Sequence, residues 1–254
     1  MRTKRVSTAY RLLREGGIKN LYDYSWLRLQ VWVKGRKNEV RVDTCVFNLA
    51  GITEVPTRIE LMTNKYELAE RRAVAQYLER DLPVVELGGS MGVVACVTNK
   101  LLTHPTSHVV VEANPMAIPE LEANRKLNGC HFEIVNCAIA YGVGSVTFRP
   151  STGLAGNSIT RDGDQPPVTV NTCSLGELVR DRGFKRFNLV CDIEGLEYDL
   201  VLQEPEVLKD ASTIIMETHA RFIGEEKFGD MMTKLQELGF KVVEEIGFVA
   251  VLQQ

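Results

Sequence analysis

The sequence predicts an α/β domain built on a mostly parallel, doubly wound sheet. Short apolar runs alternate with segments of helical periodicity from Pro83 onward, and this alternation is typical of parallel strands joined by helices. A glycine-rich turn follows the first of these runs. Two strand-like runs with no helix between them end the chain and predict one antiparallel hairpin. Together these observations predict a seven-stranded, Rossmann-like sheet.

An N-terminal extension is expected over residues 1–64, ahead of the main domain at residues 65–254. Residues 1–35 are predicted to be helical and irregular, and Val40–Asn48 is predicted as a strand because it is rich in β-formers. Residues 1–41 hold 11 Lys and Arg against 3 Asp and Glu, a net +8, so the remainder carries −11 of the total −3. This basic, aromatic segment is compatible with peripheral membrane contact or with binding an acidic glycan. The simpler interpretation is an appendage packed on the main domain.

The elements of the first half follow from the spacing of apolar residues. Asn64 and Glu67 resemble a capping box, and apolar residues recur at helical spacing from there to about Glu79. Strands are expected at Val84–Leu87, His108–Glu112 and Phe132–Val135. The second is continuously apolar, which fits a strand buried on both faces of a parallel sheet. Helices are expected from Met91 to about Leu102 and from Ile118 to Asn128, with Gly129 ending the second.

The second half begins with an antiparallel excursion. Gly144–Phe148 and Val168–Thr172 are rich in β-formers, and a loop with several glycines and prolines separates them. Ser174 is expected to cap a short helix over Leu175–Arg182. Two more buried strands are expected at Phe187–Asp192 and Ser212–Glu217. One helix is expected from about Glu197 and another over Glu225–Leu238. The closing hairpin is expected at Lys241–Glu245 with Gly247–Leu252.

The six cysteines have neither metal-site nor redox-motif spacing. They are Cys45, Cys96, Cys130, Cys137, Cys173 and Cys191. No two form a C-x-x-C pair, so we expect buried thiols in a reducing compartment, no disulfide framework and a cytoplasmic protein. No run reaches the roughly 18 apolar residues that a membrane helix needs, and the N-terminus has no secretory-signal pattern.

The turn at Gly88–Gly92 lies between a strand and a helix, where open α/β sheets bind ligands. Its spacing, G-G-x-x-G, departs from the dinucleotide pattern G-x-G-x-x-G. Glu86 precedes the turn, and a carboxylate there would repel a diphosphate and attract the ammonium group of a methionine-like tail. Glu112, 20 residues beyond Gly92, is suited to ribose hydroxyls. This interpretation favours S-adenosylmethionine, and it requires Glu86 and Glu112 to face one crevice.

At these residues the chain resembles the FkbM family of S-adenosylmethionine-dependent methyltransferases. The most specific match is Asp192-Ile-Glu-Gly-Leu-Glu197, which is similar to the family's D-x-E-G-x-E signature. Cys191 departs from the family pattern, in which a lysine or another polar residue is commoner. The other matching segments are Val84–Gly92, Val111–Pro115, Asn124, Asn128, Asn136–Ala138 and Ile215–His219. The resemblance covers roughly Glu67 to Glu245. It implies the class I methyltransferase fold and methyl transfer to a hydroxyl of a sugar, a glycan or a natural product.

The resemblance also implies which residues bind the cofactor. The turn and Glu86 would line the methionine part, Glu112 would bind the ribose hydroxyls, and the residues after each of the next two strands would flank the adenosine. The expected cofactor-binding residues are Glu86, Gly88, Gly89, Ser90, Gly92, Glu112, Ala113, Asn114, Asn136 and Ala138.

Candidate catalytic residues follow the fourth and fifth strands of the predicted sheet. An alcohol needs to lose its proton as it attacks, so a base assists methyl transfer. Asp192 and Glu194 follow one strand, and Glu217 and His219 end its neighbour. We favour Asp192 or His219 as the base, and Glu194 as a residue that shapes the pocket or holds a substrate hydroxyl. A divalent metal on these carboxylates is an alternative that the sequence does not favour.

The loop Ser151–Gln165 is a candidate lid over the cleft, with Asn157 and Ser158 as its polar contacts; a plain hairpin tip is the other interpretation. Two other functions remain open for the chain: an NAD-dependent oxidoreductase, and a non-catalytic glycan-binding protein that retains the fold. A nucleic-acid acceptor is not expected, because no Asn/Asp-Pro-Pro-aromatic motif follows the fourth strand. The expected partner is a small-molecule or glycan acceptor, and the oligomeric state is not predicted.

Overall fold

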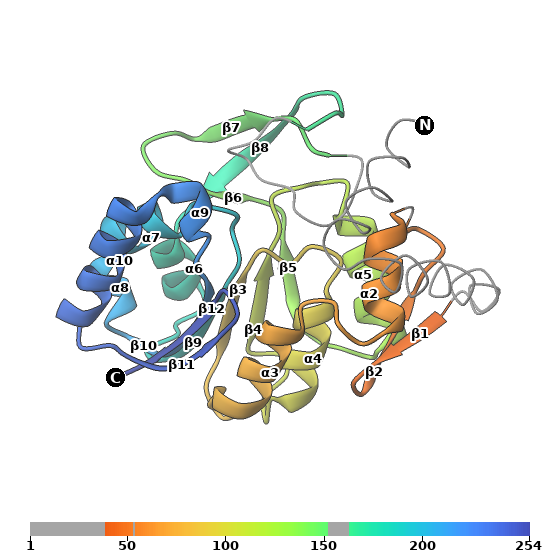
Figure 1. Ribbon diagram of the computed structural model, residues 1–254, viewed down its shortest axis with the longest axis horizontal. Coiled ribbons are helices and arrows are strands. Elements are labelled where there is room, and N and C mark those ends of the chain that lie inside the picture. Colours follow the sequence, from red (N-terminus) through yellow and green to blue (C-terminus); the bar gives the residue numbers. More distant parts are fainter. Residues whose placement is uncertain (1–38, 53, 152–162) are drawn as a thin grey trace, which may run out of the picture.

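The structure is a computed structural model that describes residues 39–52, 54–151 and 163–254 (Figure 1). The predictions for residues 1–38, including membrane or glycan contact, lie outside these ranges, as do Asn157 and Ser158 of the candidate lid. No helix among the described residues is long and apolar enough to cross a membrane.

A seven-stranded sheet forms the centre of the molecule, in the order β11-β12-β10-β9-β3-β4-β5. Parallel pairing joins β5, β4, β3, β9 and β10, whereas β12 pairs antiparallel with both β10 and β11. The predicted sheet and its terminal hairpin are therefore confirmed. The strands are β3 Val84–Leu87, β4 His108–Val111, β5 Glu133–Val135, β9 Phe187–Cys191, β10 Ala211–Glu217, β11 Lys241–Ile246 and β12 Val249–Gln253.

Helices cover both faces of this sheet (Figure 1). On one face, Val85 and Leu87 pack with apolar residues of α6, α7, α8 and α10; on the other, Val84 packs with α3 and α4, and Val110 with α4 and α5. The helices are α3 Leu68–Tyr77, α4 Val93–Leu101, α5 Ile118–Leu127, α6 Leu175–Asp181, α7 Glu197–Gln203, α8 Pro205–Leu208, α9 Ala220–Ile223 and α10 Glu225–Glu237. The short helix α9 was not predicted.

The predicted strand at Val40–Asn48 is instead a hairpin of β1 (Glu39–Val42) and β2 (Cys45–Asn48). Asp43 adopts a φ of 51°, which turns the chain where a continuous strand was expected. Asn128 of the α5 C-terminus fastens the hairpin, because its side chain bonds both the N–H and the carbonyl of Val46 at 2.7 and 2.8 Å. Helix α2 (Val55–Met62) follows. Six residues of this region share one apolar cluster with Met91 and Leu121, namely Val42, Cys45, Phe47, Leu49, Ile52 and Leu61. The domain boundary at residue 64 stays a prediction.

One of the two predicted helix caps is wrong. Asn64 bonds the side chain of Asp43 rather than capping α3, and Glu67 precedes that helix with a φ of 46°. The competing partner was far away in sequence, so the local pattern could not reveal it. At α6, by contrast, Ser174 Oγ accepts from the N–H of Glu177, and the Glu177 side chain accepts from the N–H of Ser174. This cap confirms the prediction.

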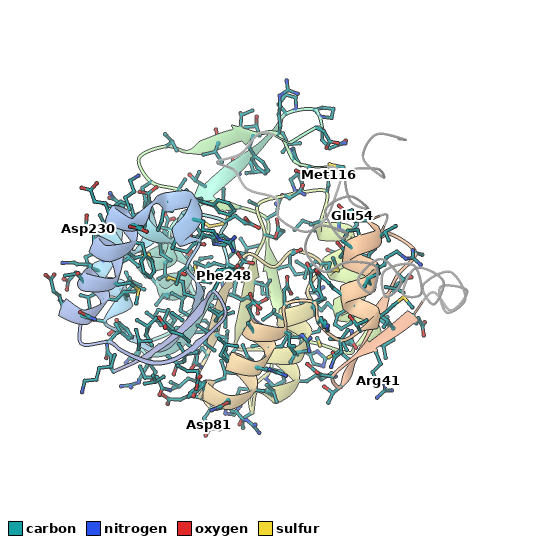
Figure 2. The ribbon with its side chains drawn as sticks, viewed as in Figure 1. Arg41, Glu54, Asp81, Met116, Asp230 and Phe248 are labelled. Carbon is teal, nitrogen blue, oxygen red and sulfur yellow. A yellow bond between two sulfur atoms is a disulfide. The ribbon has the colours of Figure 1, made fainter. Side chains whose placement is uncertain are left out.

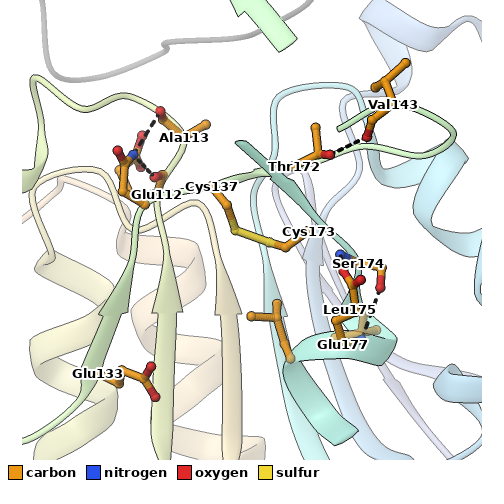
Figure 3. The surroundings of a disulfide bond; sticks show 12 residues. Glu112, Ala113, Glu133, Cys137, Val143, Thr172, Cys173, Ser174, Leu175 and Glu177 are labelled. Carbon is orange, nitrogen blue, oxygen red and sulfur yellow. Dashed lines mark hydrogen bonds between the residues drawn. A yellow bond between two sulfur atoms is a disulfide. The ribbon is translucent and has the colours of Figure 1, made fainter. Parts of the chain in front are cut away.

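The antiparallel excursion is present as β7 (Ser145–Phe148) paired with β8 (Val168–Cys173), which also pairs with β6 (Ala138–Ile139). A disulfide between Cys137 and Cys173 joins the start of β6 to the end of β8 (Figure 3). The expectation of free thiols is therefore wrong for this pair. It holds for the four others, which are free and buried: Cys45, Cys96, Cys130 and Cys191. Pairing across 36 positions is set by the fold and leaves no local signal.

The glycine-rich turn has its composition because other segments pass very close to it. Gly88 has a φ of 93°, and a Cβ there would lie 1.8 Å from the carbonyl oxygen of Asp192. Gly92 has a φ of 84°, and a Cβ there would lie 2.5 Å from a methyl group of Leu121. Both positions thus combine a backbone conformation that favours glycine with space for a hydrogen atom only.

We expect Gly88→Ala to lower the free energy of unfolding by about 3–5 kcal/mol, the sum of backbone strain and overpacking. The matched control is Gly239→Ala, since Gly239 has a φ of 97° with nothing within 4 Å of the added Cβ. It carries the strain alone and should cost about 1–2 kcal/mol. Urea unfolding measures both variants, and equal losses would contradict the close approach of Asp192 to the turn.

We expect Cys173→Ser to lower the free energy of unfolding by about 2–4 kcal/mol, because the disulfide restricts the unfolded chain. A dithiol reductant should produce a similar loss in the wild-type protein and no further loss in the variant. Thermal unfolding with and without reductant makes this comparison, and a wild-type protein indifferent to reductant would argue against the bond.

Candidate functional site

A cavity opens at the carboxyl ends of β3, β4 and β9, beside the glycine-rich turn. Five of the ten predicted cofactor-binding residues line it, namely Gly88, Ser90, Glu112, Ala113 and Ala138. Asp192 and Glu194 line it as well. The remaining lining residues are Tyr66, Glu67, Val111, Cys137, Ile139, Ile193 and Leu196. The disulfide therefore borders this cavity through Cys137.

Glu112 is the most firmly held acid of the cavity. Its carboxylate accepts hydrogen bonds from the backbone N–H groups of Ser90 and Asn114, both at 2.6 Å. Burial raises the pKa of Glu112, whereas these two hydrogen bonds lower it. The side chain of Asn136 donates to the carbonyl oxygens of Glu112 and Ala113, at 2.8 and 3.2 Å (Figure 3). Asn114 and Asn136 do not line the cavity, so they position Glu112 and Ala113 instead.

Gly89 and Gly92 also lie outside the cavity lining. A Cβ at Gly89 would lie 2.5 Å from Val110, so this glycine allows the turn to pack on β4. Together with Gly92, it shapes the turn without bordering the cavity.

The expectation for Glu86 needs correction. Glu86 is 2% exposed, and its carboxylate lies 3.2 Å from Nε2 of the buried His108 at the start of β4. It does not line the cavity that Glu112 lines, so the two acids do not face one crevice. The electrostatic argument that used Glu86 to distinguish between cofactors therefore fails. Both faces of β3 are buried, and for that reason the sequence did not reveal which face adjoins the cleft.

The acid that does line the cavity from this side is Glu67, together with Tyr66. Both precede α3, in the segment interpreted from sequence only as a helix start. Burial, with the charges of Glu70 and Asp192, raises the pKa of Glu67 well above its usual value. Burial and the charge of Glu67 likewise raise the pKa of Tyr66. Only the turn at Glu67, which the sequence did not predict, brings this carboxylate to the cavity.

Three of the four catalytic candidates, Asp192, Glu194 and Glu217, surround the fourth, His219. Its Nε2 lies 3.7 Å from Asp192, 3.5 Å from Glu194 and 3.9 Å from Glu217. Its Nδ1 lies 3.0 Å from a carboxylate oxygen of Glu197, which is fully buried. Glu197 in turn accepts from the backbone N–H groups of Ile193 and Gly195, at 3.0 and 2.9 Å. In the sequence, Glu197 stands out only by its place in the D-x-E-G-x-E match, and the structure shows that its carboxylate bonds the histidine and orients it.

Crowding of carboxylates changes the protonation of this cluster. Burial lowers the pKa of His219, but its hydrogen bond to Glu197 and the charges of Glu197, Asp192 and Glu217 outweigh burial and raise that pKa to about 9. Burial and the charge of Glu217 raise the pKa of Asp192 well above its usual value. Burial, chiefly, raises the pKa of Glu70 to about 7. At neutral pH the histidine is therefore a cation, and the raised pKa values of Asp192 and Glu217 mean that these two acids bind protons more tightly than usual.

A second cavity adjoins the first through Glu194, which lines both. Its other lining residues are Glu217, His219, Ala220, Arg221, Phe222 and Phe248. They come from the end of β10, from α9 and from the turn before β12, and Phe248 is labelled in Figure 2. The arrangement places two adjoining cavities on either side of the acid cluster.

Four residues of these cavities have positive φ without being glycine: Glu67 at 46°, Ser90 at 45°, Glu194 at 54° and His219 at 43°. Such backbone costs about 1–3 kcal/mol each and concentrates at functional sites. Propensity rules cannot place acids or histidine in this conformation, so their side-chain directions were not predictable.

Two sets of side chains have ligand atoms within 4.8 Å of one another, as a metal ion would need: Asp192, Glu197 and His219, and Glu70, Asp192 and Glu217. Nδ1 of His219 is already bonded to Glu197. Acidic groups cluster in this way without an ion, so no metal enters the mechanism below.

Comparison with known proteins identifies the family. The model of the Methyltransferase FkbM domain matches residues 86–242. No curated protein matches the chain. Among solved structures, it is similar to a ribosomal protein L11 methylase from Lactobacillus delbrueckii subsp. bulgaricus, with TM-score 0.43 and 13% identity over 74% of this chain and 77% of that one.

A second similar structure is the Pyrococcus abyssi tRNA (uracil-54, C5)-methyltransferase in complex with S-adenosyl-L-homocysteine, with TM-score 0.48 and 12% identity over 85% of this chain and 44% of that one. A third is precorrin-6y C5,15-methyltransferase from Geobacter metallireducens GS-15, with TM-score 0.44 and 12% identity over 75% and 88%. These structural similarities are low, whereas the family match spans more than half of the sequence. The chain therefore belongs to the FkbM methyltransferase family and is an S-adenosylmethionine-dependent methyltransferase.

Proposed function

We propose that the protein is an O-methyltransferase that methylates a hydroxyl group of a sugar, a glycan or another natural product. The observation that carries this proposal is the position of Asp192 and Glu194 between two adjoining cavities, because Glu194 lines both and Asp192 lies against His219 of the second. One cavity suits a nucleoside and the other suits an acceptor. A base between them can take the proton that an attacking hydroxyl releases.

The chemistry of the residues that line the first cavity fits S-adenosylmethionine. Glu112 is assigned to the ribose hydroxyls, since its carboxylate oxygens accept hydrogen bonds and lie at the end of β4. Ala113, Ala138 and Ile139 offer an apolar wall for the adenine. We assign the methionine end to Gly88, Glu67 and Asp192. The carboxylates of Glu67 and Asp192 attract an ammonium and a sulfonium. When bound, the cofactor supplies a methyl group on sulfur, and transfer breaks one S–C bond, forms one C–O bond and releases a proton.

Asp192 is the proposed base, in preference to His219. A histidine with a pKa of about 9 is already protonated at neutral pH and cannot accept the proton of the acceptor. The raised pKa of Asp192 makes its carboxylate a stronger base than an ordinary aspartate. We assign His219 to holding the carboxylates in place as a cation, and Glu194 to orienting the acceptor hydroxyl.

The cofactor, the acceptor and the two alternative functions can be separated in a first screen. Thermal shift with S-adenosylmethionine, S-adenosylhomocysteine and NAD tests the cofactor, and stabilisation by NAD alone would favour an oxidoreductase. Mass spectrometry of products from a glycan and polyketide panel tests the acceptor. Cofactor binding with a glycan bound but never methylated would favour a non-catalytic binding protein. The cytoplasmic location and the roles assigned to residues 1–41 stay predictions.

We expect Glu112→Gln to weaken binding of S-adenosylhomocysteine at least about tenfold, because a charged acceptor of two ribose hydrogen bonds is lost. Glu86→Gln is the matched control: the same chemical change on a buried acid of the neighbouring strand β3, outside the cavity. The affinity of the Glu86→Gln variant for S-adenosylhomocysteine should stay within about twofold of wild type even if its thermal stability falls. Isothermal titration calorimetry measures both, and equal weakening would contradict the assignment of Glu112.

We expect Asp192→Asn to lower kcat by about 10²–10⁴-fold on the acceptor found in the screen, since the amide cannot accept the proton. The wild-type rate should rise with pH until Asp192 is deprotonated, at a pH above the usual range for aspartate, and the variant should lack this limb. Glu194→Gln should raise KM more than it lowers kcat. A pH–rate profile that is unchanged in Asp192→Asn would remove Asp192 as the base.

We expect His219 to stabilise the fold more at pH 6 than at pH 9.5. Its pKa rises from about 6.5 in the unfolded chain to about 9 in the folded protein, so its contribution is full below pH 6.5 and disappears as pH rises through about 9. The stability difference between wild type and His219→Gln should shrink by about 3 kcal/mol over this range. Urea unfolding at both pH values measures it, with the exposed His104→Gln as control. If the stability difference between wild type and His219→Gln were the same at both pH values, the raised pKa of His219 would be contradicted.

A further inference from the structure

The second cavity contains two phenylalanines that the fold leaves largely exposed. Phe222 and Phe248 are each 57% exposed, which makes them the most exposed large apolar residues in the part of the chain that the structure describes. Both border the same cavity as Glu194, Glu217 and His219. Exposed aromatic rings beside a catalytic cluster are typical of ligand recognition.

Both rings are held in fixed positions by neighbouring groups. The ring of Phe222 stacks on the imidazole of His219, with centroids 5.5 Å apart and planes at 19°. The guanidinium group of Arg221 lies 4.3 Å from the centroid of the Phe248 ring. The carbonyl oxygen of Phe248 accepts from both the N–H and the hydroxyl of Thr218, at 3.0 and 3.1 Å. Each ring thus lies against a cationic group, and each side chain is still 57% exposed.

The polar groups of the cavity are mainly hydrogen-bond acceptors with negative charge. Glu194 and Glu217 line it, and Asp192 and Glu197 surround the histidine behind them. Three carboxylates lie within 4 Å of Nε2 of His219, and the guanidinium group of Arg221 lies over the Phe248 ring. A ligand with hydroxyl donors would satisfy the carboxylates, whereas a carboxylate or phosphate on that ligand would be repelled by several of them.

We propose that this second cavity is the acceptor subsite, and that it selects a polyhydroxylated ring without negative charge. Phe222 and Phe248 contact the apolar C–H faces of the ring, while Glu194 and Glu217 accept hydrogen bonds from its hydroxyls. This inference rests on the proposed function, and it adds which residues recognise the acceptor and which acceptors are excluded. It makes Phe222, Phe248 and Glu217 specificity-determining residues.

The experiment compares two probes that differ in one group: methyl glucopyranoside, which is neutral, and methyl glucuronide, which carries a carboxylate on the same ring. Saturation-transfer NMR titrations use the full chain with S-adenosylhomocysteine bound. We expect the neutral ring to bind at least tenfold more tightly than the anionic ring. Equal binding of the two probes, tighter binding of the glucuronide, or no binding of either would overturn the proposal.

Variants then test the assigned residues. Phe222→Ala and Phe248→Ala should each weaken binding of the neutral probe at least fivefold. Leu127→Ala truncates another exposed apolar residue, on α5, and should leave this binding unchanged. Glu217→Gln should bring the affinities for the two probes closer together, whereas Glu226→Gln on α10 should leave the ratio of these affinities unchanged. Phenylalanine variants that bind like wild type would overturn the proposal.

The same samples separate this inference from the proposed function. S-adenosylhomocysteine affinity is measured first in each variant, and its retention also shows that the variant is folded. A wild-type protein that fails to bind S-adenosylhomocysteine would contradict the cofactor assignment itself. Normal cofactor affinity combined with indifference to the charge of the probe would contradict only the acceptor subsite.

Discussion

Parallel pairing of β3, β9 and β10 is the constraint on which the rest of the site depends. The register sets Leu87 beside Cys191 and Cys191 beside Met216, so the three strands end at one edge of the sheet. The next residues along each strand are Gly88, Asp192 and Glu217. The missing side chain of Gly88 lets the carbonyl of Asp192 come close to the turn. Acids distant in sequence are therefore neighbours in a crevice that the strands themselves define.

This proximity has an electrostatic cost, and the protonation of the cluster reflects it. Burial in the crevice, and after it the repulsion between neighbouring carboxylates, raises the pKa values of Glu70, Asp192 and Glu217. His219 offsets part of this repulsion as a cation, and Glu197 holds it there through a buried hydrogen bond. Since a sulfonium and an ammonium bring further positive charge, the unliganded cluster is suited to a cationic cofactor. The same charge is the basis of the proposal that the adjoining cavity disfavours an anionic acceptor.

The sequence predicts the sheet, the order of its elements and the closing hairpin, because apolar periodicity is a local signal that agrees with the final fold. It also predicts the strand-end acids Glu112, Asp192 and Glu217, since parallel strands must present their ends together. It fails at Glu86, because a strand buried on both faces gives no sign of which face adjoins the cleft. It fails at Glu67 and at the Cys137–Cys173 bond for a different reason. A left-handed turn and a pairing across 36 residues are imposed by packing far from each position.

The strained backbone positions connect these observations. Four residues other than glycine have positive φ and line at least one of the two cavities: Glu67, Ser90, Glu194 and His219. Glycine would adopt these angles with less strain, so the side chains are retained at a cost of about 1–3 kcal/mol each. At Glu194 this backbone places one carboxylate against both cavities, and at His219 it places one imidazole among four acids. Because Glu194 lines both cavities, any shift of its backbone changes both at once. Binding on one side is therefore expected to influence binding on the other through this residue.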